Sequence, residues 1–204
     1  GGMGGLTAAV LLQRVGFEVT VYEQAKQLAR IGAGINIYPN GMNVLRATGV
    51  VDQLMALGQV PKTWFSRVWD TGDLLYSQPQ QEWHSKYGEP HTILHRGDLQ
   101  GALAGKLQPG TLQFNKHVIG IDEVGDALEV RFADGASVQA DVVIGADGVN
   151  SKVRELLLGP EPPKYSGFVA YRSVFPASRL SRALDSDGCK FWSDIVARQV
   201  GNGP

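Results

Sequence analysis

A cluster of glycines at the start of the chain, Gly1–Gly5, constrains the fold more than any other feature. Residues 6–15 carry apolar side chains at helical spacing, and a strand pattern over residues 18–23 ends in an acid. Only glycine lets backbone approach a phosphate group closely while a helix N-terminus points at it. The order of turn, helix and strand therefore predicts a nucleotide-binding turn whose glycines are Gly2, Gly4 and Gly5.

The acid that ends this strand is Glu23, which follows the glycines at about the 20 residues expected for a carboxylate that binds a ribose. A carboxylate there disfavours a 2′-phosphate, so FAD or NAD is predicted rather than NADP. The glycine turn alone is a weak signal, because a flexible chain end has the same composition. The chain has no initiator methionine, and we expect it to be truncated, with the first glycine and first strand of the motif before residue 1.

Composition excludes several other classes of protein. The 19 basic and 20 acidic residues give a net charge of -1 and form no cluster, so neither a nucleic-acid nor a membrane partner is expected. No apolar stretch is long enough to cross a bilayer, and no secretion signal is present. The single cysteine, Cys189, excludes an internal disulfide and favours a reducing compartment, so a cytoplasmic location is expected.

Further helices and strands are predicted along the rest of the chain. Helix patterns cover residues 40–58 with a break at Gly49, residues 98–106 and residues 151–158. Strand patterns cover residues 112–114, 128–132, 138–144 and 165–174, with irregular strands and loops over residues 63–95. The apolar triplet Val142-Val143-Ile144 predicts a strand buried on both faces. Gly125-Asp126-Ala127 is interpreted as a hairpin turn.

Three further motifs each have a structural and a functional interpretation. Arg30 precedes a glycine-rich run that either turns into a strand or passes beneath a flat cofactor. Arg96 starts a helix, and a surface cation or an N-terminal ion pair is the more frequent explanation of such a residue. Asp147 and Gly148 follow the predicted buried strand, where open α/β sheets place their ligands, although Asp147 could equally cap the next helix.

In this order, these segments resemble the flavoprotein monooxygenases of the para-hydroxybenzoate hydroxylase type. The matching residues are Gly2–Leu6, Glu23, Arg30 with Gly32–Ile35, His95–Leu99, and Gly145–Gly148 with Ser151 and Arg154. The resemblance extends to about Asp194 and implies an α/β fold, with a Rossmann-like FAD-binding domain of parallel sheet and antiparallel β-meander. It implies an FAD-binding domain over residues 1–61 and 97–160, and a partial substrate-binding sheet over residues 62–96 and 161–204.

The resemblance also implies a role for individual residues. Gly4 and its neighbours would bind the FAD pyrophosphate, and Glu23 the adenosine ribose. Arg30 and Arg96 would lie along the pyrophosphate and ribityl part, and backbone near Val118 would meet the adenine. Asp147, with Gly148 beside it, would order the pyrophosphate region and assist docking of the nicotinamide nucleotide.

The activity implied is hydroxylation of a hydroxylated aromatic or N-heteroaromatic acid similar to 6-hydroxynicotinate, with molecular oxygen as co-substrate. NAD(P)H, with NADH favoured, would reduce the FAD, and the full-length protein could form a homodimer. In hydroxynicotinate-type relatives a histidine at the position of Asn36 is a candidate base. An amide cannot take up a proton near neutral pH. No catalytic residue is therefore assigned, and Asn36 is expected to hydrogen-bond flavin or substrate.

Several alternatives remain open at this point. They are a flavin hydroxylase of a quinone precursor or polyketide, an NAD-dependent dehydrogenase, and a non-catalytic decayed fragment. A dehydrogenase would share the turn and Glu23 but would not explain Gly145–Gly148. The four histidines have no metal-ligand spacing, so no metal site is expected. We expect no turnover from the chain as written, because the absent first strand would lie centrally, between the strands that end at Glu23 and Ile144.

Overall fold

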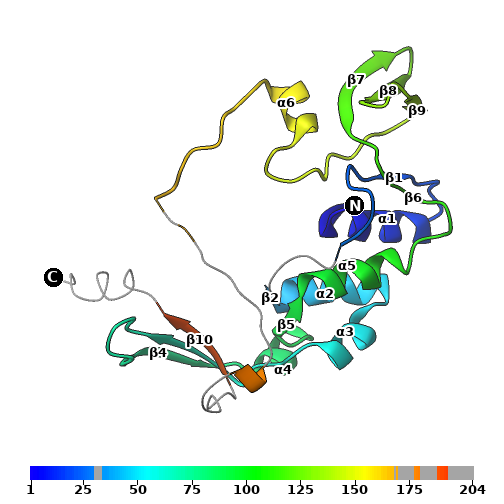
Figure 1. The fold of residues 1–204 in the computed structure, drawn as a ribbon. Helices are drawn as coiled ribbons and strands as arrows, with labels where there is room; N and C mark the ends of the chain where they lie inside the picture. Colours follow the sequence, from blue (N-terminus) through cyan, green and yellow to red (C-terminus); the bar gives the residue numbers. More distant parts are fainter. Residues whose placement is uncertain (30–33, 168, 170–176, 180–187, 193–204) are drawn as a thin grey trace. The chain divides into compact units, whose positions relative to one another are not determined.

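The computed structural model describes residues 1–29, 34–167, 169, 177–179 and 188–192 (Figure 1). The chain divides into two compact units, which are described separately below. Unit 1 comprises Gly1–Gly32, Ala47–Val50 and Arg96–Arg172, and unit 2 comprises Ala33–Arg46, Val51–His95 and Ser173–Pro204. The assignment of a cofactor domain and a substrate domain stays a prediction. Among the described residues, none of the helices is both long and apolar enough to cross a bilayer.

The described residues of unit 1 form three helices and five strands. The helices are α1 (Met3–Arg14), α5 (Arg96–Ala104) and α6 (Lys152–Leu158). The strands are β1 (Val21–Tyr22), β6 (Leu112–Gln113), β7 (Val118–Val124), β8 (Ala127–Phe132) and β9 (Ser137–Ala140). Helix α5 begins two residues earlier than the sequence pattern predicted, at Arg96.

The core of unit 1 lies between α1 and α5, which run side by side in Figure 1. Leu6 and Val10 lie one helical turn apart on α1, as do Leu99 and Leu103 on α5, and all four are buried. Each buried leucine contributes roughly 1.5–3 kcal/mol relative to an exposed one. This packing holds the N-terminal turn of α1 in a defined position.

The strands of unit 1 form one parallel and one antiparallel group. β1 pairs with β6 in parallel, with Val21 opposite Leu112. β7, β8 and β9 form an antiparallel meander, and the link from Val124 to Ala127 is the predicted hairpin turn. The parallel pair and the meander confirm the α/β class with a β-meander.

Where it is described, unit 2 consists of two sheets and three α-helices. Its strands are β2 (Gly34–Ile37), β3 (Thr63–Arg67), β4 (Leu74–Pro79), β5 (Thr92–His95) and β10 (Gly188–Trp192). Its helices are α2 (Pro39–Thr48), which extends into unit 1, α3 (Val51–Leu57) and α4 (Trp83–Tyr87), with the short 3-10 helix η1 (Ala177–Arg179). β2 pairs antiparallel with β5, and the other sheet has the order β10-β3-β4.

The structure confirms one prediction about local structure and contradicts another. Gly49 separates α2 from α3 as predicted, with a φ of 75° that favours glycine. The predicted strand over Val142-Val143-Ile144 is wrong: β9 ends at Ala140, and Val142 and Ile144 are 73% and 57% exposed. A strand exists only through hydrogen bonds to a neighbour, and in the described part of the chain no strand pairs with this triplet.

The strand predicted over residues 165–174 is also absent where it can be checked. Residues 165–167 and 169 have no strand conformation, and the rest of the prediction lies outside the described residues. Tyr165 and Val169 are both exposed.

Candidate functional site

The N-terminus of α1 forms the first part of the site. Gly2 is the N-cap residue in extended conformation, with φ -74° and ψ 171°, and its carbonyl accepts the first helical hydrogen bond from Leu6 N at 3.0 Å. No side chain caps this end, and the first turn contains no acid. The first N–H groups of a helix have no partner within the helix and carry the positive end of its dipole. This end can therefore bind an anion such as a pyrophosphate.

The glycines of this turn differ in what surrounds them. A Cβ added at Gly1 would lie 2.9 Å from Glu23 Cβ, and one added at Gly5 would lie 3.3 Å from Ala146 Cβ. Gly4 is exposed, and an added Cβ would meet no atom within 4 Å. The turn is thus closely packed toward Glu23 and Ala146 and open at Gly4, which is a shape that fits a nucleotide pyrophosphate.

Glu23 directly follows β1, at the carboxyl end of the parallel pair. Its Oε1 accepts a hydrogen bond from Ala25 N at 2.8 Å, and its Oε2 lies 3.2 Å from the Gly1 nitrogen. Burial acts to raise the pKa of this carboxyl, but the hydrogen bonds from Ala25 N and the Gly1 nitrogen outweigh it, so the pKa lies below its usual value. Glu23 is therefore a carboxylate near neutral pH, with lone pairs left to accept hydroxyl groups.

The segment before β7 lies beside Glu23. Lys116 N donates to the carbonyl of Glu23 at 2.9 Å, and the His117 ring nitrogen Nδ1 lies 2.9 Å from Gln24 Oε1. Val118 begins β7 directly after these contacts. The structure therefore brings the predicted adenine-side residue and the predicted ribose acid into one neighbourhood.

Arg96 is the first residue of α5 and is half-buried. The same helix is tied to the glycine turn by Gln100, whose Nε2 donates to the carbonyl of Gly1 at 2.7 Å. No ion pair joins Arg96 to another described residue, so the predicted N-terminal ion pair is not found among them. Arg30 lies outside the described residues.

Asp147 binds the first N–H groups of α6, in agreement with its structural interpretation, although the N-cap residue itself is Ser151. Its carboxylate accepts hydrogen bonds from Ser151 Oγ, from Lys152 N at 2.7 Å and from Val153 N at 3.1 Å. Burial tends to raise its pKa, but the Ser151 hydroxyl and the N–H groups lower it more, so the pKa is below its usual value. Gly148 follows with a φ of 79°, a conformation that favours glycine.

Asn36 belongs to unit 2, on an exposed position of β2. Its Oδ1 lies 2.9 Å from Nε2 of His91, and Nδ1 of His91 lies 2.5 Å from Gln80 Oε1. His91 is 1% exposed, and this burial lowers its pKa. The sequence indicated only a structural or surface histidine. The link to Asn36 was missed because it depends on the pairing of β2 with β5.

Aromatic rings surround His91. Tyr38 stacks on it with ring centroids 4.7 Å apart and an interplanar angle of 10°. Trp83 and Trp64 lie at 6.0 and 6.2 Å in tilted orientations. These contacts hold the orientation of the imidazole ring, and they show that Trp64 and Trp83 pack against it.

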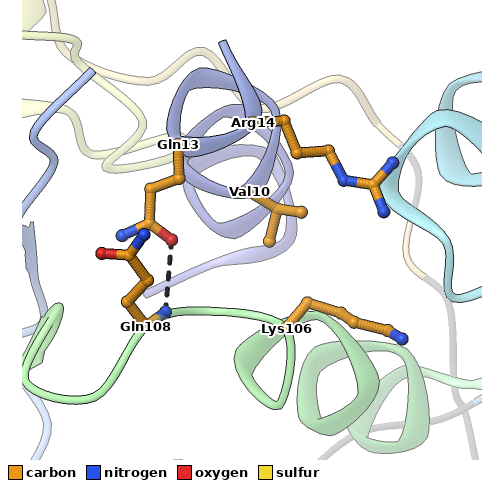
Figure 2. Close-up of a pocket in the computed structure, with 5 residues that line it drawn as sticks. All are labelled: Val10, Gln13, Arg14, Lys106 and Gln108. Atoms are coloured by element: carbon orange, nitrogen blue, oxygen red, sulfur yellow. Dashed lines mark hydrogen bonds between the residues drawn. The ribbon is translucent and has the colours of Figure 1, made fainter. Parts of the chain in front are cut away.

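A hollow at the other end of α1 does not belong to the predicted site. Figure 2 shows its lining, which is Val10, Gln13, Arg14, Lys106 and Gln108. Gln108 N donates to Gln13 Oε1 at 3.2 Å across it. The lining residues on α1 follow the glycines of the turn by five to twelve residues, which is roughly 8–18 Å along the helix. Its two cations lie where α1 and α5 end and complement the negative ends of their dipoles.

Known proteins resemble this chain over most of its length. A family model described as FAD binding domain matches residues 1–179. The 6-hydroxynicotinate 3-monooxygenase of Bordetella bronchiseptica is 46% identical over 195 residues, which are 95% of this chain and 51% of that protein. The chain thus spans about half the length of the curated relatives it matches.

Two solved structures show the same fold. HpxO of Klebsiella pneumoniae, crystallised with FAD and uric acid, has a TM-score of 0.70 and 30% identity, over 79% of this chain and 41% of that one. The 2,6-dihydroxypyridine-3-hydroxylase of Arthrobacter nicotinovorans has a TM-score of 0.68 and 30% identity, over 82% and 40%. Among the described residues no group of His, Cys, Asp or Glu could hold a metal ion. Because the family model matches more than half of its residues, this chain belongs to the family of FAD binding domains.

Proposed function

We propose that this chain supplies the FAD-binding part of a monooxygenase that hydroxylates a hydroxylated aromatic or N-heteroaromatic acid. The observation that carries the proposal is the packing of the glycine turn against Glu23 on one side and Ala146 on the other. In this proposal the helix N-terminus, the Glu23 carboxylate and the loop of Ala146 and Asp147 would together bind the dinucleotide within unit 1. Relatives that hydroxylate aromatic acids support the proposed reaction.

Different residues of unit 1 would bind different parts of FAD. The N–H groups at the start of α1 would donate to the pyrophosphate, and the Glu23 carboxylate would accept hydrogen bonds from the ribose hydroxyls. Arg96 would supply a countercharge, and backbone near Val118 would contact the adenine. Asp147 would act through α6, because its carboxylate orients that helix and the loop containing Gly148. Bound FAD supplies the redox and oxygen chemistry, while the protein orients it and excludes water.

We propose NADH rather than NADPH as reductant, because the acid at Glu23 is a feature of sites without a 2′-phosphate. We keep the cytoplasm as the location, since a single cysteine suits a reducing compartment. A homodimer of the full-length protein also remains a proposal.

One observation supports the expectation that the 204-residue chain alone has no monooxygenase activity. Val142 and Ile144 form an apolar segment that is exposed and unpaired with any strand in the described part of the chain. Burying this apolar surface against a neighbouring strand would stabilise the folded state by about 25 cal/mol per Å² of buried area. We therefore propose that catalysis needs further polypeptide beside this segment.

The test compares two proteins. One is the 204-residue chain. The other, called the completed protein, joins it to the segments of the Bordetella bronchiseptica relative that lie outside the match. The completed protein should bind FAD, turn yellow, and consume oxygen with NADH only when an aromatic acid such as 6-hydroxynicotinate is added. Hydride transfer to a carbonyl compound without oxygen uptake would contradict the proposal and favour a dehydrogenase. The chain alone should show no turnover.

A further inference from the structure

Gln100 ties α5 to the glycine turn of α1 through a buried hydrogen bond. Its Nε2 donates to the carbonyl of Gly1 at 2.7 Å, although the two residues are 99 positions apart in the chain. Gln100 is 7% exposed, and Leu99 beside it is buried where α5 runs along α1 (Figure 1). A buried donor whose backbone is already fixed by packing loses little further freedom when it forms such a bond. Gln100 therefore holds the Gly1 carbonyl in one direction.

The direction of this carbonyl decides the direction of the next N–H group. A peptide unit is planar, and no described peptide bond is cis, so the C=O of Gly1 and the N–H of Gly2 point in opposite directions. The Gly1 carbonyl points toward Gln100, so the Gly2 N–H points away from it. Within the described ranges, no atom accepts a hydrogen bond from this N–H. Gly2 thus presents an oriented donor, without a described protein partner, at the N-cap of α1.

Packing against Glu23 and the position of Arg96 both bear on what this peptide can do. A Cβ added at Gly1 would lie 2.9 Å from the Cβ of Glu23 and 3.0 Å from its Cγ, so the Gly1–Gly2 peptide is confined on that side. Arg96 lies one helical turn before Gln100 on the same face of α5. The hydrogen bond from Gln100 therefore fixes the glycine turn relative to the helix end that begins with this cation.

We propose that Gln100 is a positioning residue for FAD: by holding the Gly1 carbonyl, it directs the N–H of Gly2 at the pyrophosphate before the cofactor binds. The inference rests on the proposed function, because that function assigns the pyrophosphate to the start of α1. Gln100 acts through the peptide that it holds and not through contact with the cofactor. The pyrophosphate is a charged acceptor, so a Gly2 N–H that points elsewhere loses a charge-assisted hydrogen bond.

The first test compares Gln100→Met with Gln13→Met in the completed protein. Methionine keeps an unbranched side chain of similar length and removes the donor. Gln13 is the matched control, because its Nε2 also donates at 2.7 Å to a distant residue of unit 1, Thr111, but from the other end of α1. Gln13 also accepts from Gln108 N, so its replacement disturbs at least as many hydrogen bonds.

Both variants should lower the stability of the fold, because each loses a tie between distant segments of unit 1. Only Gln100→Met should weaken FAD binding, with a Kd about fivefold higher or more in a flavin fluorescence titration. Gln13→Met should bind FAD as tightly as the parent protein. Equal Kd values for the two variants, whether both raised or both unchanged, would overturn the proposal, because a purely structural tie affects stability alone.

A second measurement does not depend on how the variants fold. In ¹⁵N-labelled completed protein without FAD, the side-chain N–H groups of Gln100 should already exchange slowly with solvent, because the bond to Gly1 precedes cofactor binding. Addition of FAD should slow the exchange of the Gly2 N–H, which then donates to the pyrophosphate. A Gly2 N–H that exchanges equally fast with and without FAD would overturn the proposal. Fast exchange of the Gln100 amide before FAD is added would overturn it as well.

The two proposals fail with different results. A completed protein that does not bind FAD overturns both of them. FAD binding and hydroxylation by the completed protein, together with equal Kd values for Gln100→Met and Gln13→Met, overturn only the role of Gln100.

Discussion

Gly5 in the first turn of α1 and Ala146 approach so closely that a Cβ added at Gly5 would lie 3.3 Å from the Cβ of Ala146. The two residues are far apart in the sequence and come from different elements, so their contact reports the tertiary fold of unit 1. Glu23 closes the other side of the same turn through its contact with Gly1. The glycine turn therefore lies against Glu23 and against Ala146, the residue before Asp147.

Gly4 provides a test of cofactor binding that is separable from stability. Gly4→Ala should leave the stability unchanged or raise it by up to about 1 kcal/mol, because alanine is the better helix former and no protein atom is within 4 Å. We expect FAD affinity of the completed protein to fall at least about tenfold, because the new Cβ would occupy space needed by the pyrophosphate. Denaturant unfolding and FAD fluorescence titration measure the two effects.

Gly101 is the matched control for Gly4. It lies in α5, and an added Cβ there also meets no atom within 4 Å. Gly101→Ala should raise stability to a similar or greater extent and leave FAD affinity unchanged. Equal FAD affinities of the two variants would contradict the role assigned to the turn.

Asp147→Asn should destabilise unit 1 by about 1 kcal/mol at neutral pH, because it weakens the hydrogen bonds that the carboxylate accepts from Lys152 N and Val153 N. The pKa of Asp147 is lowered below 3.8 in the folded chain. Its contribution to stability is therefore complete above pH 3.8 and is lost as the pH falls through the lower folded pKa. The difference between the two proteins should shrink over that acidic window in urea unfolding experiments. Asp141→Asn, at an exposed position outside any cap, should change stability little at any pH.

The burial of His91 should make the stability of the chain depend on pH in a second, less acidic range. Its folded pKa is below 6.5, so the unfolded chain binds the proton more readily and stability falls as the pH decreases below 6.5. The loss ends once the pH is below the folded pKa. His91→Gln should remove this part of the pH dependence, measured as the difference in unfolding free energy between pH 7.5 and pH 5. A variant with the same dependence as the parent chain would show that His91 is not buried in its neutral form.

The two acidic partners of Arg46 should contribute unequally to the stability of the fold. Its guanidinium donates from Nε and Nη2 to both oxygens of Glu89, at 2.5 and 3.0 Å, and from Nη1 to Asp52 at 2.9 Å. The Glu89 side chain is 5% exposed, whereas that of Asp52 is 95% exposed. Arg46→Met leaves the buried Glu89 carboxylate without its counterion, so the loss of stability should be several times that of Asp52→Asn. Thermal unfolding of both variants tests this ratio, and similar losses would contradict it.

Local patterns were sufficient to predict many elements of the fold. The helical spacing after Gly5, the break at Gly49 and the hairpin at Gly125-Asp126 all depend on neighbouring residues, and each was confirmed. Motif spacing likewise identified Glu23 as the acid after a strand. The prediction failed at Val142-Val143-Ile144, because an apolar triplet becomes a strand only when another strand supplies hydrogen bonds.

The sequence by itself determined the order of turn, helix, strand and acid, and with it membership of an FAD-binding family, because these features depend on spacing along the chain. Only the tertiary structure decided which distant residues meet. Ala146 against Gly5, Lys116 beside Glu23, and His91 behind Asn36 all depend on strand pairing and helix packing. Burial and orientation arise from such contacts between distant segments. For this reason the contact between Asn36 and His91 is evident from the folded chain and not from its sequence.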